Sequence, residues 1–108
     1  MGQEVLIDRT KLIKLIKQNL INYNMQLTEV FVSKYPIPIE NIKDSFGKVI
    51  FDKQGNSKGW FVFVDPCKIA NWSHTCEYWF VINETEAFYS KTEQWKPWEE
   101  LEIEQIPL

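Results

Sequence analysis

The chain has 108 residues, of which 44% are hydrophobic and 25% are charged, and these values are typical of one globular domain spanning residues 1–108. Its formal net charge of −3 argues against nucleic-acid binding, which requires a basic surface, and suits a basic protein partner. The sequence has no apolar run close to the roughly 18 residues that a membrane helix needs, and its start does not resemble a secretory signal. We therefore predict a cytoplasmic protein with no membrane partner. In that compartment its cysteines would be reduced.

An amphipathic helix is predicted from Arg9 to Asn24. Asp8 precedes it and can accept a hydrogen bond from a free backbone N–H of the first turn. Apolar side chains recur in this segment every three or four residues, which is the spacing of one helix face: Leu12, Ile16, Leu20 and Tyr23. We therefore expect this face to pack into the core.

Short apolar segments after the helix predict strands at 30–32, 48–52, 60–65, 76–83 and 87–91. Residues 36–44 contain two prolines and predict an irregular crossing. Residues 53–59 predict a hairpin loop in which Gly55 and Gly59 can adopt positive φ, and residues 84–86 predict a tight turn. The tail from Pro97 predicts a helical turn and then an edge strand, in which Leu101 and Ile103 alternate with glutamates.

The two central strands are apolar on both faces. In the segment 60–65, Trp60, Val62 and Val64 point one way, whereas Phe61 and Phe63 point the other. A sheet with one wet face would alternate apolar and polar residues. The helix can cover one face only, so the C-terminal segment, the mate of a homodimer or another protein must cover the second.

The stretch from Asp65 to Trp79 holds both cysteines and the only histidine of the chain. If the chain binds a metal, its ligands would be Cys67, His74 and Cys76. However, these residues lack the closely spaced cysteine pair that is usual in structural zinc sites. A disulfide within this loop is geometrically feasible. A Cys–His nucleophile would lack a glycine-rich turn or helix start to stabilise an oxyanion. We predict structural cysteines, no metal, no cofactor, no catalytic residue and no enzymatic activity.

The loop from Asp65 to Thr75 is longer than the roughly two to five residues usual in hairpins, and long loops on a rigid sheet tend to be functional. We predict that it contacts a partner, with Trp72 as its anchor and Asn71 and His74 beside it. The alternative is that Trp72 folds back over the second sheet face. A secondary surface for a basic partner, with association slowed by salt, is predicted at the acidic tail: Glu99, Glu100, Glu102 and Glu104.

Three segments of the chain resemble small bacterial immunity proteins of polymorphic-toxin systems: Gly59–Phe61, Val81–Tyr89 and Pro97–Leu101. They match a Gly-Trp-aromatic strand, a strand followed by a turn and a short strand, and a late Pro-x-Glu-Glu-Leu segment. The insert at 65–76 is outside this pattern. The resemblance implies a cystatin-like fold and a protein that neutralises a partner, such as a toxin or a basic enzyme.

The expected fold is thus α+β, with one long N-terminal helix packed on an antiparallel sheet of four to five strands. The expected function is a non-enzymatic protein-binding or inhibitory module, of the kind found among immunity proteins. The alternative is a small ligand- or metal-binding domain that uses the Cys67–Cys76 loop.

Overall fold

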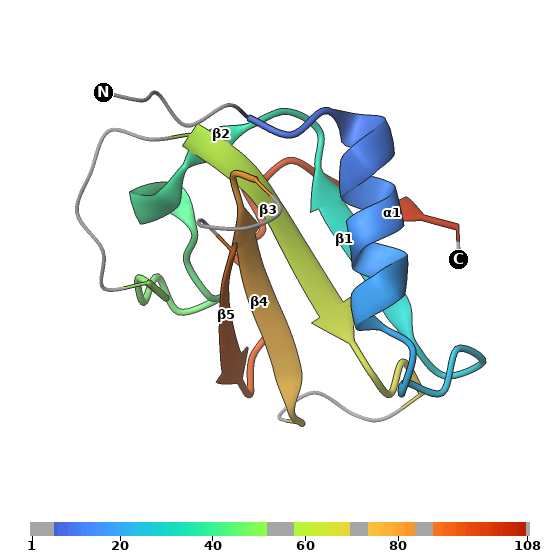
Figure 1. The fold of residues 1–108 in the computed structure, drawn as a ribbon. Helices are drawn as coiled ribbons and strands as arrows, with labels where there is room; N and C mark the ends of the chain where they lie inside the picture. The colour runs from blue at the N-terminus through green and yellow to red at the C-terminus, as the bar shows by residue number, and fades with distance from the viewer. Residues whose placement is uncertain (1–5, 52–57, 70–73, 84–87, 108) are drawn as a thin grey trace.

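The computed structural model describes residues 6–51, 58–69, 74–83 and 88–107 (Figure 1). Within these ranges the chain forms an α-helix, a short 3-10 helix and six strands. In chain order these are α1 Arg9–Asn19, β1 Glu29–Ser33, β2 Ile37–Pro38, the 3-10 helix Ile39–Asn41, β3 Lys58–Asp65, β4 Cys76–Val81, β5 Phe88–Glu93 and β6 Ile103–Ile106.

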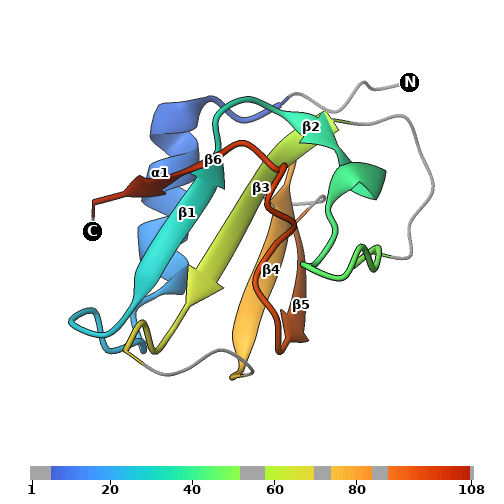
Figure 2. The ribbon, with the colours of Figure 1, turned by 180° about the vertical axis from the view of Figure 1, so that it is seen from behind.

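Five of the strands form a continuous antiparallel path in the order β5-β4-β3-β1-β6, and the short β2 pairs with the start of β3 (Figure 2). At the centre, Val62 of β3 lies opposite Val32 of β1 on one side and Trp79 of β4 on the other. The predicted α+β class with an antiparallel sheet is confirmed. The described sheet has six strands, one more than the upper limit of the prediction.

The helix α1 packs on the first face of the sheet, against apolar side chains of β1, β3 and β4 (Figure 1). Asp8 caps it, since its Oδ1 accepts the backbone N–H of Lys11 at 2.8 Å. The predicted core residues Leu12, Ile16 and Leu20 are at most 1% exposed. No helix in the described residues has the length and apolar character required to cross a lipid bilayer.

The helix is shorter than predicted, because it ends at Asn19 and not at Asn24. The N–H of Leu20 reaches back to the carbonyl of Lys17, which tightens the last turn. Asn24 then starts a separate turn, in which its Oδ1 accepts the N–H of Gln26 at 3.1 Å. Asparagine side chains compete with helical hydrogen bonds in this way. The spacing of apolar residues, from which the helix was predicted, does not reveal this competition.

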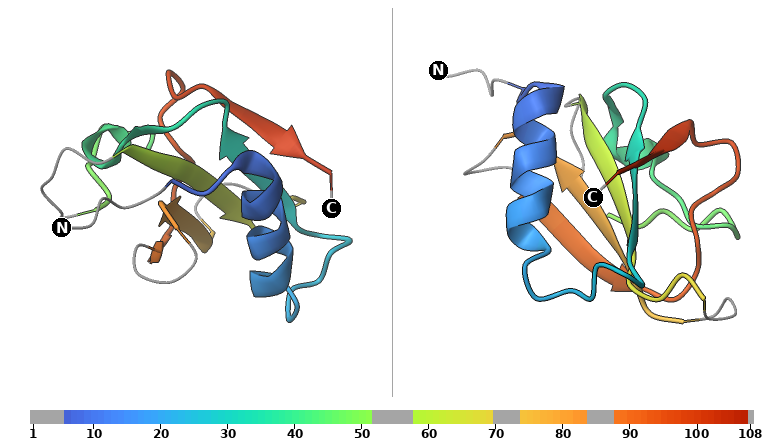
Figure 3. Two further views of the ribbon diagram at one scale, coloured as in Figure 1. Left: turned by 45° about the horizontal axis from the view of Figure 1, so that its top comes forward. Right: turned by 90° about the vertical axis from the view of Figure 1, so that its right-hand side faces the viewer.

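Two segments of the same chain cover the second face of the sheet (Figure 3, right). One is the segment 39–51. The other is the C-terminal segment, residues 94–103, whose side chains Leu101 and Ile103 pack against the apolar cluster of this face. The predicted apolar character of both faces is confirmed, and the C-terminal segment is one of the covers that the prediction named. The rings beneath these segments are at most 3% exposed in the single chain: Phe61, Phe63, Tyr78 and Phe80.

The predicted strand at 48–52 is wrong for its described residues, 48–51. This segment turns back on residues 42–44, where the N–H of Ile50 donates to the carbonyl of Ile42 and that of Asp44 to the carbonyl of Lys48. One edge of β3 is taken by β2 at its start and by β1 further along, and the other edge is taken by β4, so no edge is left for a hairpin partner. Residues 53–57 of the predicted loop and the predicted turn at 84–86 lie outside the described residues.

Gly59 lies in β3 and does not adopt the positive φ expected for it; among the described glycines that conformation belongs to Gly47, with φ of +83°. A Cβ atom on Gly59 would lie 2.7 Å from Cζ of Phe80 and 2.9 Å from the carbonyl oxygen of Val81. The strand therefore needs glycine at this position for close approach to β4.

The predicted edge strand in the tail is confirmed as β6, which pairs with β1. The residues before it form a single turn, closed by a hydrogen bond from the N–H of Leu101 to the carbonyl of Trp98 at 3.1 Å. The segment from residue 94 to residue 102 thus leads from the end of β5 across the second face to β6 (Figure 2).

Candidate functional site

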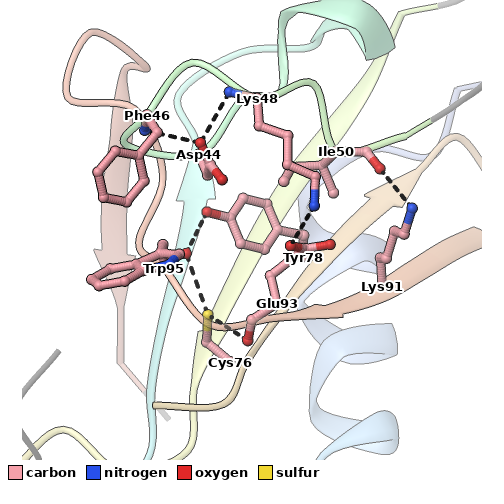
Figure 4. A network of polar contacts seen from close by, with 9 residues as sticks. All are labelled: Asp44, Phe46, Lys48, Ile50, Cys76, Tyr78, Lys91, Glu93 and Trp95. Carbon is pink, nitrogen blue, oxygen red and sulfur yellow. Dashed lines mark hydrogen bonds and ion pairs between the residues drawn. The ribbon is translucent and has the colours of Figure 1, made fainter. Parts of the chain in front are cut away.

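A turn at residues 44–48 is held by the carboxylate of Asp44. Its Oδ1 accepts the backbone N–H of Phe46 at 2.9 Å and of Lys48 at 3.0 Å (Figure 4). The N–H of Gly47 donates to the Asp44 carbonyl at 2.9 Å. Asp44 is 4% exposed, whereas Phe46 at the apex of the turn is 72% exposed. The turn is therefore a fixed support that presents a phenyl ring to solvent.

Phe46 packs edge-to-face against Trp95, with ring centroids 5.0 Å apart and ring planes at 86°. Trp95 follows β5 and is 37% exposed. The N–H of Ser45 donates to the carbonyl of Lys96 at 2.9 Å, which joins the turn to the segment that carries Trp95. Beside the two rings lies a hollow of about 510 Å³ whose wall includes Lys48, Thr75, Thr92, Glu93 and Gln94. We call Phe46, Trp95 and this hollow the aromatic surface.

Two buried side chains of β4 hold the backbone of Trp95 (Figure 4). The hydroxyl of Tyr78 donates to the Trp95 carbonyl at 2.6 Å, and the Cys76 thiol lies 3.5 Å from the same oxygen. Burial, followed by the charge of Asp65 and other nearby carboxylates, raises the pKa of Cys76 to about 12. Burial also raises the pKa of Tyr78. Both groups stay protonated near neutral pH, so they serve as donors, and the thiol is a poor nucleophile.

Two lysines near the aromatic surface are engaged with the protein (Figure 4). Lys48 Nζ lies 3.3 Å from Glu93 Oε1, and Lys91 Nζ donates to the carbonyl of Ile50 at 3.2 Å. These contacts tie the segment 48–50 to β5. They add to the support of the turn, although an exposed ion pair contributes little stability by itself.

The predicted structural role of Cys76 leads to a contrast with Cys67. Cys76 is fully buried among aromatic rings, whereas Cys67 is half-buried at the start of its loop. Cys76→Ser is expected to lower the free energy of unfolding by about 1–3 kcal/mol, because it replaces a weakly polar sulfur by a more polar hydroxyl among buried aromatic rings. Cys67→Ser is expected to change it by less than about 0.5 kcal/mol. Urea unfolding of the two variants under reducing conditions measures this difference, and equal losses would contradict it.

The histidine of the predicted contact loop is bound at the base of that loop. His74 Nε2 lies 2.7 Å from Oδ1 of Asp65, and the same oxygen accepts the N–H of Cys67 at 3.0 Å. The side chain of His74 is 16% exposed and that of Asp65 is 7% exposed, so this pair holds the loop to the end of β3. Asn71 and Trp72 lie outside the described residues, and their role as partner contacts stays a prediction.

The three residues named as potential metal ligands do not converge. Cys76 lies in the core of the second face, His74 is paired with Asp65, and both cysteines are free thiols. In the described ranges, no group of three His, Cys, Asp or Glu side chains is arranged to hold a metal ion. The geometry therefore does not support the metal-binding form of the alternative function.

The predicted acidic residues Glu99, Glu100 and Glu102 are all exposed, and they follow Trp95 along the same segment. Glu102 accepts a hydrogen bond from the hydroxyl of Tyr35 at 2.6 Å. Glu104 forms an ion pair with Arg9 at the start of α1. Two of the four carboxylates of the predicted acidic surface are thus engaged with the protein, while Glu99 and Glu100 form no hydrogen bond or ion pair within the described residues.

The aromatic surface was not predicted from the sequence, although residues 44–47, Asp-Ser-Phe-Gly, carry a signal for it. An aspartate followed three residues later by glycine favours a turn. A phenylalanine inside such a turn cannot reach the core easily, so it is a candidate for an exposed contact. Residues 44–47 directly precede the segment 48–52, whose predicted strand left no exposed turn to be expected there.

Comparisons with known proteins found no match for the chain. No family model matches it, and no curated protein or solved structure is detectably similar.

Proposed function

We propose that this chain is a non-enzymatic protein-binding or inhibitory module and that it contacts its partner through the aromatic surface. The observation that supports this proposal most is the 72% exposure of Phe46 at the apex of a turn whose backbone is fixed by the buried Asp44. A large apolar ring gains from leaving water, and this chain holds it in water at a fixed position.

The rigidity of the turn favours recognition of another protein. Binding costs conformational entropy when loops and side chains become ordered, and a preorganised ring avoids most of that cost. Aromatic side chains dominate the energetic centres of protein interfaces. Phe46 and Trp95 stand together with a hollow beside them, which gives the partner both a raised contact and a recess to fill.

The charge of the chain suggests the character of the partner. The net charge is −3, and the exposed Glu99 and Glu100 follow the aromatic surface along the chain. A basic protein would be steered toward this region. This character agrees with the resemblance to immunity proteins, which implies a toxin or another basic enzyme as the partner and a cystatin-like arrangement of the fold.

Replacing the exposed ring tests the proposal. Phe46→Ala is expected to weaken partner binding by at least about 2 kcal/mol, or roughly thirtyfold in Kd, because central aromatic residues carry most of the energy of an interface. The melting temperature should change little, since the ring is largely exposed. The partner is isolated by affinity capture from the native host, and its Kd for each variant is then measured with purified proteins.

Ile21→Ala provides a matched control, because Ile21 is 83% exposed and follows α1, which packs on the other face of the sheet. This variant should bind the partner like the unmodified protein. Equal affinities of the Phe46→Ala and unmodified proteins would reject the aromatic surface as the contact. If Phe46→Ala binds like the unmodified protein and Trp72→Ala loses binding, the contact belongs to the predicted loop.

A further inference from the structure

The hollow of the aromatic surface has a wall of mixed chemistry (Figure 4). Two aromatic rings line it, those of Phe46 and Trp95, and its charged side chains are Asp44, Glu93 and Lys48. Uncharged polar groups complete the wall: Thr75, Thr92 and Gln94. With a volume of about 510 Å³, the hollow is large enough to receive a long side chain of another protein.

The charged groups of this wall sum to a negative charge. The carboxylates of Asp44 and Glu93 stand against one ammonium group, that of Lys48. Backbone N–H groups stabilise the charge of Asp44 through its Oδ1, but they do not remove it. The exposed ring faces of the aromatic pair are also regions of negative potential. The rings and the charges of the wall therefore both favour a cation.

The lysine of the wall can be replaced by an incoming cation. Lys48 Nζ lies 3.3 Å from Oε1 of Glu93, and its side chain is 60% exposed, whereas that of Glu93 is 12% exposed. An ion pair with so exposed a lysine contributes little stability. Glu93 keeps its position because it is largely buried at the end of β5, so its carboxylate is a fixed acceptor in the hollow.

We propose that the hollow receives an arginine side chain of the partner protein. Its guanidinium group stacks on the ring of Trp95 and donates to the carboxylate of Glu93. Arginine suits both contacts better than lysine, because a planar guanidinium stacks on aromatic rings and donates two parallel hydrogen bonds to a carboxylate. This inference rests on the function proposed above, and it names the group that the partner presents to the aromatic surface.

NMR titration of the indole N–H signal of Trp95 tests the charge of the ligand with two probes of closely similar shape. N-acetylarginine methylamide is expected to shift this signal in a saturable manner. N-acetylcitrulline methylamide carries a neutral urea in place of the guanidinium and should bind at least about tenfold more weakly, because it loses both the cation–π contact and the ion pair.

Three variants test the charges of the wall with the arginine probe. Glu93→Gln is expected to weaken its binding about fivefold, which corresponds to about 1 kcal/mol. Lys48→Met should strengthen its binding about twofold, because this change removes the competing cation. Glu40→Gln is the matched control for Glu93→Gln, since it neutralises an exposed carboxylate outside the hollow, and it should bind the probe like the unmodified protein.

Equal binding of the two probes to the unmodified protein would overturn the proposal. So would an unchanged affinity for the arginine probe in Glu93→Gln, an equal loss in Glu40→Gln, or weaker binding in Lys48→Met. The captured partner separates this proposal from the function proposed above. If Phe46→Ala weakens partner binding and Glu93→Gln does not, the aromatic surface is the contact but the hollow does not hold an arginine. If neither variant weakens it, the proposed contact itself is wrong.

Discussion

Phe61→Ala is expected to lower the free energy of unfolding by about 3–5 kcal/mol. Phe61 is fully buried at the centre of the second face, with its ring centroid 5.6 Å from that of Tyr78. Its removal leaves a cavity beneath the segment 39–51, and the flanking strands β1 and β4 prevent the backbone of β3 from moving inward to fill it. Chemical denaturation monitored by circular dichroism measures the loss.

Phe46→Ala is the matched control for this variant, because it deletes the same side chain at a position that is 72% exposed. Its free energy of unfolding should change by less than about 1 kcal/mol. If the two substitutions cost the same, Phe61 is not packed between the sheet and the covering segments as described.

Leu20→Ala is expected to lower the free energy of unfolding by about 2–5 kcal/mol. Leu20 is 1% exposed at the end of α1 and belongs to the core of the first face. Its loss opens a cavity where the helix meets the sheet. Denaturant titration of this variant beside Ile21→Ala, which alters an adjacent side chain that is 83% exposed, isolates the effect of burial. An unchanged midpoint for Leu20→Ala would mean that the helix is not docked.

The two core variants also test whether the faces of the sheet act independently. Leu20 and Phe61 belong to separate apolar clusters on opposite faces. Losses at sites without shared partners usually add within about 0.5 kcal/mol. The double variant should therefore lose the sum of the two single losses, and a clear departure from that sum would indicate coupling through β3.

Local patterns predicted the elements that depend on neighbouring residues. The alternation in residues 60–65 placed Trp60 and Val62 on one face and Phe61 on the other, and the clusters confirm this division. The predicted apolar face of the helix was correct from Leu12 to Leu20, since its side chains in that range are buried. Pairing partners were harder to predict, because β1 pairs with β3 and β6, which are distant in the sequence. Apolar alternation shows which face a strand buries but not which strand lies beside it.

The candidate site shows the same limit. The position of Cys76 in the core follows from alternation in its strand, and the burial of its thiol confirms that position. The pairing of His74 with Asp65 and the contact of Phe46 with Trp95 both join residues through tertiary structure. A recess of about 430 Å³ is lined by β1, β3 and residues 96–103, and spacing within one of these segments could not indicate it.

The place of β1 between β3 and β6 has a consequence for the speed of folding. The strands β3, β4 and β5 follow one another in sequence, so the loops that close when they pair are much shorter than those of β1. The strand β1 ends at Ser33 and has to find partners at 62–65 and 103–106. Distant closures cost more entropy and slow folding. Folding is therefore expected to begin in β3, β4 and β5, with β1 and β6 joining late, so that substitutions in β6 should accelerate unfolding and leave the refolding rate nearly unchanged.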